Sequence, residues 1–263
     1  MDLGLKGKAA IVVASSKGLG KAVALGLARE GANLAICARG EKDLKQTAEE
    51  IKSATGVEVL FQIADVSQRE QIKSFVLAAA DKFGRIDILV NNAGGPPPGT
   101  FMDFSESDWL SAINLNLMST IHFTRKVVPY MQKNRWGRII NITSVSVKQP
   151  LDELILSNTA RAGVIGLAKS LANELAQYNI LVNNVCPGMI LTDRVRNISR
   201  AVSERQGVSP HDVISNWSKN IPLGRIGEPD ELAGLVVFLA SERASYITGT
   251  TIQIDGGYVK GIM

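Results

Sequence analysis

A loop of small residues near the start of the chain has the composition of a phosphate-binding turn. This loop, which separates an apolar run from a helical pattern, reads Ala14-Ser15-Ser16-Lys17-Gly18-Leu19-Gly20. Small side chains at a strand–helix junction let backbone N–H groups approach a pyrophosphate, and the start of the helix adds partial positive charge. We therefore expect the residues from Ser15 to Gly20 to bind the phosphates of a dinucleotide.

The end of the second predicted strand indicates which dinucleotide is bound. An NAD-binding chain usually places Asp or Glu there to bind the ribose 2′-hydroxyl, whereas this chain has Ala38-Arg39. The guanidinium of Arg39 can hold a 2′-phosphate through its fork of donors, and Lys17 in the facing loop supplies a second cation. Either residue alone is also compatible with a solvated surface charge, but together they favour NADP(H).

Short apolar runs alternate with amphipathic stretches along nearly the whole chain, and these elements must position the loops. The runs, which we expect to be buried parallel strands, span residues 9–14, 33–38, 57–63, 86–90, 138–143, 181–185 and 251–254. The helical patterns between them span residues 18–30, 41–54, 69–83, 107–134, 153–178 and 230–241. This alternation predicts an α/β fold with a doubly wound, seven-stranded parallel sheet. Because no linker or repeat interrupts it, we expect residues 1–263 to form a single domain.

The composition argues against several other functions. With 29 basic and 25 acidic residues, the net charge of +4 is too small and too scattered to indicate nucleic-acid binding. There is no signal-peptide pattern and no apolar run long enough to span a membrane, so we expect a cytoplasmic protein with no membrane association. Cys37 and Cys186 lie far apart in apolar runs, as reduced core thiols do. His122 and His211 lack the spacing of metal ligands, and we expect no metal site.

Further motifs follow the predicted strands in a consistent order. They read Asp65-Val66, Asn91-Asn92-Ala93-Gly94, Trp109 with Asn116-Leu117, Pro187-Gly188-Met189-Ile190-Leu191-Thr192, and residues 249–257. With the amino-terminal loop, which is similar to a TGxxxGxG motif whose Thr-Gly is replaced by Ala14-Ser15, they resemble the short-chain dehydrogenase/reductase family over essentially the whole chain. The branch most similar contains the 3-oxoacyl-acyl-carrier-protein reductases and sugar dehydrogenases. The resemblance implies a single-domain Rossmann fold and a carbonyl/alcohol couple.

The resemblance also implies cofactor contacts beyond the amino-terminal loop. The contacts near the adenine and along the sheet edge are expected from Asp65, Val66, Asn92, Ala93 and Gly94. The backbone expected to orient the nicotinamide amide belongs to Pro187, Gly188, Ile190 and Thr192. The small, rigid run at residues 94–99 either shapes the mouth of a substrate pocket or forms a stiff turn into the next helix.

The resemblance breaks at the catalytic centre. Ser144 matches the serine that hydrogen-bonds the substrate oxygen, and Asn116 matches the family's structural and catalytic asparagine. The family has Tyr thirteen residues after this serine and Lys four residues later, whereas this chain has Ser157 and Arg161. The residues after Arg161 keep the family register, so a misalignment does not explain the difference. The resemblance still implies that Arg161 holds the nicotinamide ribose.

These replacements alter the acid–base chemistry. Carbonyl reduction needs a proton for the developing alkoxide, and a serine hydroxyl is a far weaker acid than tyrosine, whose pKa is about 10. Arg161 keeps the positive charge of the lysine but does not exchange protons near neutral pH. Lys148, on the same loop as Ser144, is either a replacement donor or a solvated lysine. A water held by Ser144, Ser157 and Asn116 is another route.

Two functions therefore stay open. The first is an NADP(H)-dependent oxidoreductase that interconverts a carbonyl and an alcohol with an altered proton donor, which Ser144, Asn116 and the Pro187-Gly188 segment favour. The second is a catalytically silent NADP(H)-binding sensor or scaffold, which Ser157 favours. The motifs point to a small-molecule substrate without identifying it.

The sequence also predicts features of one polar segment, of one helix start and of the subunit assembly. The polar segment 189–220 is either a mobile substrate lid or an ordinary pair of surface helices. Asp152 and Glu153 are expected to begin the helix at residues 153–178. This helix and the one at residues 107–134 resemble the helices that pair subunits in the family, which implies a homotetramer, with a dimer as the alternative.

Overall fold

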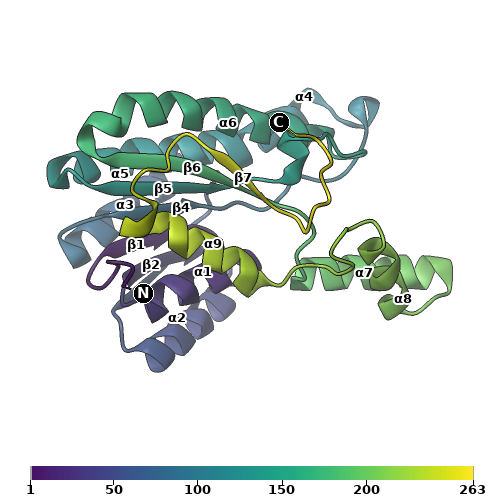
Figure 1. Ribbon diagram of the computed structural model, residues 1–263, viewed down its shortest axis with the longest axis horizontal. Helices are drawn as coiled ribbons and strands as arrows, with labels where there is room; N and C mark the ends of the chain where they lie inside the picture. Colours follow the sequence, from purple (N-terminus) through teal and green to yellow (C-terminus); the bar gives the residue numbers. More distant parts are fainter. Residues whose placement is uncertain (1, 263) are drawn as a thin grey trace.

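One parallel sheet of seven strands runs through the molecule, as the computed structural model in Figure 1 shows for residues 2–262. The strand order across the sheet is β3-β2-β1-β4-β5-β6-β7. The strands are β1 (Ala9–Val12), β2 (Asn33–Ala38), β3 (Val59–Ile63), β4 (Ile88–Asn91), β5 (Gly137–Ile142), β6 (Ile180–Pro187) and β7 (Thr251–Ile254). The predicted doubly wound, seven-stranded parallel sheet is therefore confirmed.

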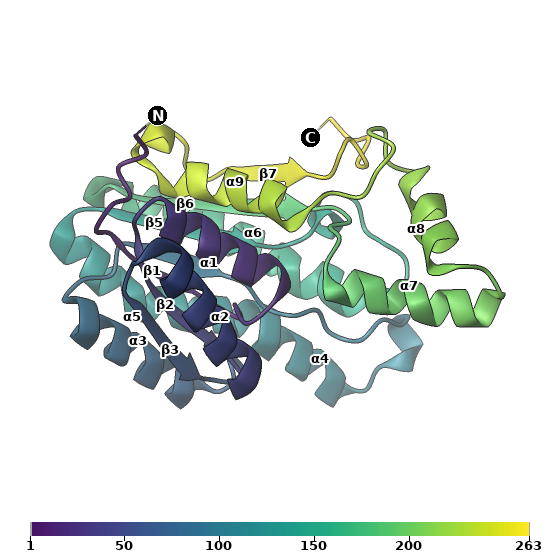
Figure 2. The ribbon, with the colours of Figure 1, turned by 90° about the horizontal axis from the view of Figure 1, so that it is seen from below.

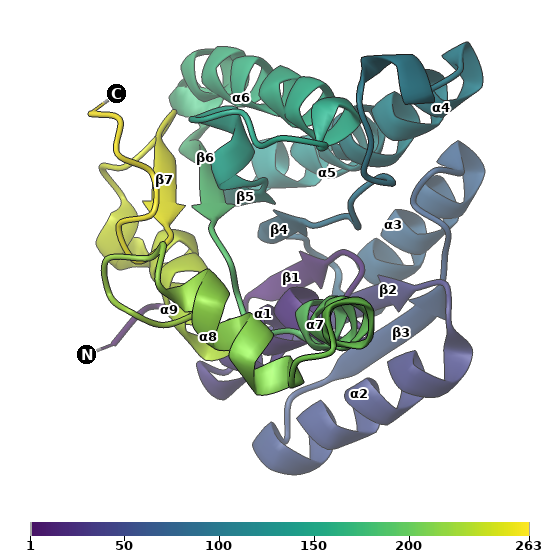
Figure 3. The same ribbon diagram turned by 90° about the vertical axis from the view of Figure 1, so that its right-hand side faces the viewer.

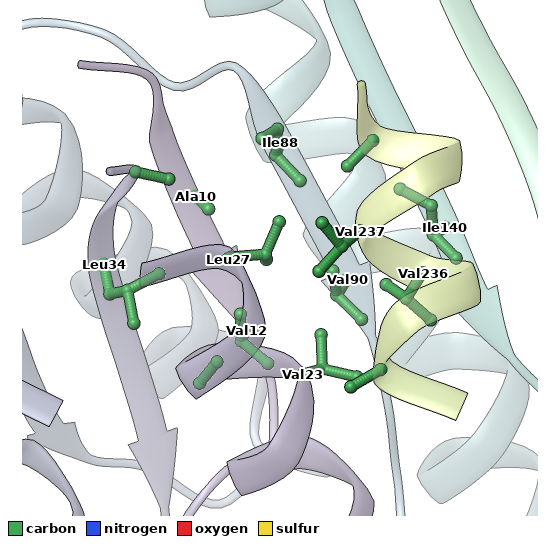
Figure 4. Packing of buried hydrophobic residues seen from close by; sticks show 14 of the residues in the cluster. Ala10, Val12, Val23, Leu27, Leu34, Ile88, Val90, Ile140, Val236 and Val237 are labelled. Atoms are coloured by element: carbon green, nitrogen blue, oxygen red, sulfur yellow. The ribbon is translucent and has the colours of Figure 1, made fainter. Parts of the chain in front are cut away.

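Three helices cover one face of this sheet: α1 (Gly18–Arg29), α2 (Glu41–Thr55) and α9 (Pro229–Ala240). Figure 4 shows how Val23 of α1 and Val236 of α9 meet above Val12 and Val90 of the central strands, and all four side chains are fully buried. Burying an aliphatic side chain of this size stabilises the fold by about 1.5–3 kcal/mol. This layer fixes the start of α1 directly beneath the carboxyl end of β1.

Three other helices cover the opposite face: α3 (Arg69–Phe83), α5 (Ser119–Asn134) and α6 (Ile155–Leu175). Figure 3 shows the sheet between the two helical layers. Phe75 of α3 and Phe123 of α5 pack edge to face with ring centroids 6.3 Å apart, a favourable geometry for aromatic pairs. The helix α6 lies against β6 and carries Arg161 to the carboxyl end of β5.

The chain reverses its direction of travel across the sheet between β1 and β4. From β1 it builds outward to β2 and β3, then crosses back to β4 and continues to β7. The loops after β1 and β4 therefore diverge at the carboxyl ends of the strands, which opens a crevice between them. Ligands of open α/β sheets bind at this kind of crevice.

A row of buried polar side chains joins β4, β5, β6 and β7. Asn91 Nδ2 donates to Asn141 Oδ1 at 2.9 Å, Asn141 Nδ2 donates to Asn184 Oδ1 at 2.9 Å, and Asn184 Nδ2 donates to Thr251 Oγ1 at 3.1 Å. Because a slip of one residue would leave these buried amides unpaired, the row fixes the register of the strands whose ends carry the site.

The helix expected at residues 107–134 is not continuous. It begins one residue earlier as α4 (Glu106–Ile113), passes through a π-helical turn at Asn114–Met118, and resumes as α5. Ser105 caps its start by accepting a hydrogen bond from the backbone N–H of Asp108. Apolar periodicity does not distinguish one π turn from the surrounding α-helix, and such turns are frequent at functional sites.

The segment at residues 189–220 forms two helices, α7 (Asp193–Gln206) and α8 (Pro210–Ser218), which project from the body of the molecule in Figures 1 and 2. The excursion closes on itself, because Leu191 N donates to Gly227 O at 2.8 Å and Gly227 N donates to Met189 O at 3.1 Å. The side of α7 lies over the carboxyl end of the sheet, as Figure 3 shows. The segment expected to be either a substrate lid or a pair of surface helices therefore contains two helices.

Candidate active site

A cleft of about 1190 Å³ lies at the carboxyl ends of the strands, between the loops after β1 and β4 and the side of α7. It extends from Arg39 after β2 to Thr143 and Arg161 beyond β5. The residues expected at a cofactor site that line it are Ser16, Lys17, Gly18, Leu19, Arg39, Asp65, Val66, Asn92, Ala93, Gly94, Arg161 and Thr192. The cleft therefore joins the two ends of the expected dinucleotide site.

The remaining cofactor residues expected from the sequence support the cleft without lining it. Ser15 is completely buried, and its Oγ donates to Val12 O at 2.8 Å, which fixes the turn after β1. Gly188 N donates to Ile254 O at 3.0 Å and holds the end of β6 against β7. The other members of this group are Gly20, Pro187 and Ile190.

The turn after β1 leaves no space for a side chain at Gly20. A Cβ atom there would lie 2.4 Å from Ala14 O and 2.9 Å from Asn92 Nδ2. Asn92 Nδ2 also donates to Val13 O and Ala14 O at 3.2 Å each, which ties the β4 loop to this turn. Such close approach of backbone segments fits a loop that presents N–H groups to phosphate.

The register expected for the glycine motif was wrong by one residue. Ala14 has a φ of +51°, in the left-handed region, and the positive-φ residues do not include Ser15. Counting back from Gly18, the first glycine of a TGxxxGxG motif falls on Ala14, and Val13 takes the threonine position. Val13 and Ala14 therefore both depart from the motif, and Ala14 is the departure that strains the backbone, because glycine adopts this conformation without strain.

The two cations expected at the 2′-phosphate have different surroundings. Lys17 Nζ forms a 2.8 Å ion pair with Asp43 in the first turn of α2, and this hydrogen bond raises the pKa of the lysine. Arg39 is exposed and forms no ion pair with any described residue. Hydrogen bonds from Ser67 and the nearby charge of Arg39 lower the pKa of Asp65. Of these two cations, Arg39 is therefore the one available to bind a 2′-phosphate.

Arg161 is buried, with 8% of its surface exposed, at the inner end of the cleft. Its Nε donates to Ser157 Oγ at 3.1 Å. Its other nitrogens donate to the carbonyl oxygens of Ala93, Ile142 and Thr143 at 3.1, 3.2 and 3.2 Å. Burial lowers the pKa of Arg161 to about 10, so the guanidinium stays charged near neutral pH. The side chain joins the carboxyl ends of β4 and β5.

Ser144 and Lys148 lie at opposite ends of a single 3₁₀ turn, Val145–Val147. Ser144 Oγ accepts from Ser146 N at 3.1 Å, so its own proton is free to point elsewhere. Burial raises the pKa of the Cys186 thiol, while a hydrogen bond with Thr143 and the charge of Lys148 oppose that shift. The charge of Lys148 therefore lies within electrostatic reach of Cys186.

Asn116 lies in the π-helical turn and is buried. Its Nδ2 donates to Gly94 O at 2.9 Å, which holds the loop after β4, whereas its Oδ1 has no hydrogen-bond partner among the described residues. Ser144, Lys148, Ser157 and Asn116 do not line the cleft themselves. Ser144 directly follows Thr143 of the cleft wall, Ser157 accepts a hydrogen bond from Arg161, and Asn116 holds Gly94.

Asp152 and Glu153 do not begin α6, contrary to expectation. The helix starts at Ile155, with no acidic residue in its first turn. Glu153 has a φ of +57°, and its carbonyl accepts a 2.6 Å hydrogen bond from Gly99 N. The backbone at this position is used to anchor the loop after β4, which explains why the helix begins later.

Comparison with known proteins agrees with this geometry. A family model described as Enoyl-(Acyl carrier protein) reductase matches residues 13–259. The 3-oxoacyl-[acyl-carrier-protein] reductase FabG of Aquifex aeolicus is 38% identical over 98% of this chain and 99% of its own length, and that of Staphylococcus epidermidis is 38% identical over 95% and 98%. The crystal structure of L-sorbose reductase from Gluconobacter frateurii, complexed with NADPH and L-sorbose, matches with a TM-score of 0.97, 35% identity and 100% of both chains. The chain belongs to the short-chain dehydrogenase/reductase family.

Several cleft residues of this short-chain dehydrogenase/reductase were missed by the sequence interpretation. The most important are cations on α7, namely Arg194, Arg196 and Arg200, together with Asp43 on α2. A helix assigned to the polar segment would have shown that Arg196 and Arg200, four residues apart, share one face. The sequence alone does not show that this face turns toward the β1 and β4 loops.

Two further properties of this short-chain dehydrogenase/reductase concern the described residues as a whole. Between residues 2 and 262, no helix combines the length and apolar character needed to cross a membrane. In the same part of the chain, His, Cys, Asp and Glu side chains do not gather in any group of three or more that could hold a metal ion.

Proposed function

We propose that this protein is an NADPH-dependent oxidoreductase that interconverts a carbonyl and an alcohol with a proton donor other than tyrosine. The observation that carries the proposal is the continuous cleft between Arg39 and Arg161, which has a glycine turn at its centre. L-sorbose reductase, which has the same fold, was crystallised with NADPH and a sugar substrate. The names of the relatives range from acyl-carrier-protein reductases to a sorbose reductase, so the proposal names the reaction and not one substrate.

The residues present fit a dinucleotide with a 2′-phosphate. The backbone around Gly18 and Gly20 forms a cradle that a Cβ at Gly20 would obstruct, and the start of α1 adds partial positive charge there. Arg39 stands at the far end without a carboxylate partner. A guanidinium binds phosphate in a bidentate manner, whereas an NAD site uses an acidic residue at this position.

The reacting centre lies at the opposite end of the cleft, where NADPH supplies a hydride when bound. Ser144 accepts a hydrogen bond from Ser146, so its hydroxyl proton can be donated to a substrate oxygen. Asn116 holds the Gly94 carbonyl and thereby fixes the loop beside that oxygen. Arg161 holds the ends of β4 and β5 together and supplies positive charge near the developing alkoxide.

Two sources of the proton are compatible with these contacts. Lys148 is one turn away from Ser144, and its charge is close enough to Cys186 to affect the pKa of that thiol. Alternatively, a water can donate the proton from a position between Ser144, Ser157 and the unpaired Oδ1 of Asn116. The Lys148→Met variant distinguishes them, because it abolishes the first route and leaves the second intact.

The test is the loss of NADPH absorbance with a broad panel of ketones and aldehydes. Turnover above a heat-denatured control, lost in Ser144→Ala with NADPH affinity unchanged, supports the proposal. Ser146→Ala is the matched control. It removes a neighbouring hydroxyl, but Ser146 contacts Ser144 through its backbone N–H, which the variant keeps. Absence of turnover with every compound, in protein that binds NADPH, would contradict it.

One observation favours a second function, that of a catalytically silent NADP(H)-binding sensor or scaffold. Every nitrogen of Arg161 donates to a protein oxygen, and Ser157 accepts one of these bonds. This is the geometry of a structural cation. The second function gains support if NADPH binds with no turnover and instead changes assembly state or partner binding.

We also propose a homotetramer in the cytoplasm, in which residues 189–220, with α7 and α8, act as a substrate lid. The assembly is supported by the exposed apolar side chains of Leu110 on α4 and Phe238 on α9. Light scattering checks the assembly, with a tetramer expected at four times the 28.2 kDa of the chain. A dimer is the alternative outcome.

A further inference from the structure

Two arginines contact the same three-residue segment after β4 from different elements. Arg161 of α6 donates to Ala93 O at 3.1 Å. Arg194, in the first turn of α7, places its Nη1 and Nη2 atoms 3.2 and 3.4 Å from the position that a Cβ of Gly95 would occupy. Gly94 lies between these two contacts and lines the cleft. The two guanidinium groups therefore flank one point on the cleft wall.

No acidic side chain balances these two charges. Within residues 2–262, neither Arg161 nor Arg194 forms an ion pair. Asp193, the adjacent residue on α7, interacts electrostatically with Lys17 on the other side of the cleft. The charge of Arg194 is instead felt by Arg161, whose pKa it helps to lower after burial. Two like charges at this position are stabilised when an anion lies between them.

The cofactor's own anionic groups are accounted for elsewhere. The pyrophosphate is expected at the turn containing Gly18 and Gly20, and the 2′-phosphate at Arg39. Both positions follow β1 and β2, whereas Arg161 and Arg194 contact the loop that follows β4. Thr143 and Arg161 line this end of the cleft, which the proposed function assigns to the substrate.

We propose that Arg194 is the specificity-determining residue for an acidic substrate, and that it binds a carboxylate or phosphate group attached to the reacting carbonyl compound. The inference rests on the proposed function and names its substrate class as oxo acids or phosphorylated ketones. Arg194 is exposed on α7, so it contacts the anion from the lid side. Arg161 supplies the second charge from the sheet side. An arginine suits this role because its fork of donors matches a carboxylate or a phosphate.

Binding experiments test the proposal without requiring turnover. The probes are 2-oxobutanoate and 4-oxopentanoate, each compared with its neutral methyl ester, titrated calorimetrically into protein saturated with NADP⁺. Arg194→Met is expected to weaken binding of the oxo acids about 10- to 100-fold, as expected for the loss of a charged hydrogen bond. The esters and NADPH itself are expected to bind with unchanged affinity. Arg194→Lys is expected to restore part of the loss.

Arg205→Met is the matched control, because Arg205 lies on the same helix, carries the same charge and does not line the cleft. The inference is overturned if the wild-type protein binds acids no better than esters. It is also overturned if Arg194→Met weakens acids and esters equally, or weakens NADPH, because the arginine would then serve the cofactor. Failure of the proposed function gives a different result. In that case the protein still prefers acids in a way that depends on Arg194, but no ketone is reduced by NADPH.

Discussion

Arg161 donates a hydrogen bond from Nε to the hydroxyl oxygen of Ser157 over 3.1 Å. These residues lie four apart, one turn along α6, at the positions where the family resemblance implies lysine and tyrosine. Since Ser157 accepts this bond, its own proton points away from Arg161. The guanidinium remains charged near neutral pH, because burial lowers its pKa only to about 10. In the proposed reaction the pair therefore supplies charge and position, and the proton comes from another group.

Restoring the family pair should accelerate the reaction. The double variant Ser157→Tyr with Arg161→Lys introduces a phenol whose proton is far more acidic than that of serine, and we expect about 10²- to 10⁴-fold faster turnover of a given ketone. The tyrosine ring enters a buried position, which costs about 1–3 kcal/mol of stability. Turnover is measured with thermal unfolding as a check. A folded double variant that binds NADPH without any gain in rate would contradict the proposed register.

Cofactor preference should depend on Arg39 more than on Lys17. Arg39→Asp removes the free cation and adds a carboxylate for the ribose hydroxyl, so we expect NADPH affinity to fall about 10- to 100-fold while NADH affinity rises. Asp43→Asn should have the opposite, smaller effect, because it releases Lys17 from its ion pair; we expect about two- to fivefold tighter NADPH binding. Fluorescence titration measures both. An unchanged preference in Arg39→Asp would exclude a 2′-phosphate site there.

Ala14→Gly should stabilise the protein. Ala14 has a φ of +51°, and relief of this left-handed strain outweighs the added freedom of glycine in the unfolded chain. We expect the free energy of unfolding to rise by about 1 kcal/mol and the melting temperature by about 2–4 °C. In Ala78→Gly, in the middle of α3, we expect a loss of about 1 kcal/mol. A destabilised Ala14→Gly protein would show that the alanine side chain makes a contact that offsets the strain.

Stability should decline in alkaline solution because of Cys37. Burial raises the pKa of this thiol from 9.0 to about 12, so the neutral thiol is favoured in the folded state. Its contribution is complete below the pKa of the unfolded chain and is lost as the pH rises from about 9 to about 12, by at most about 1.4 kcal/mol per pH unit. Urea unfolding at several pH values gives the free energy of unfolding, which should fall less steeply with rising pH in Cys37→Ala than in the wild-type protein. Identical slopes would contradict this assignment.

The sheet was predictable because its signals are local. Each strand is a short, mostly apolar run, and α3 ends at Phe83, as predicted, with Gly84 after it at a φ of +68°. The π-helical turn around Asn116 was not predictable, since one extra residue in a turn leaves the apolar pattern nearly unchanged. The late start of α6 also escaped prediction, because it depends on a hydrogen bond between Gly99 and Glu153, which are distant in sequence.

The candidate site was predictable where a motif lies at a strand end. Lys17, Arg39 and Arg161 were all expected, and all line the cleft. Asp43 was not, because its pairing with Lys17 depends on the angle at which α2 leaves β2. Arg194 escaped notice for a similar reason, since its contact with Gly95 depends on the direction in which α7 projects. Tertiary geometry, and not residue type, determines both roles.

The two ends of the α7–α8 excursion meet at one junction, where residues 189–191 and Gly227 hydrogen-bond to each other. Its ends are already joined, so its length and composition can change at little entropic cost to the sheet. The segment between residues 191 and 227 can therefore be replaced by another of different length or sequence. A graft of the segment at this junction would replace Arg194 and the cleft-lining Thr192 together, and would leave the glycine turn and Arg39 unchanged.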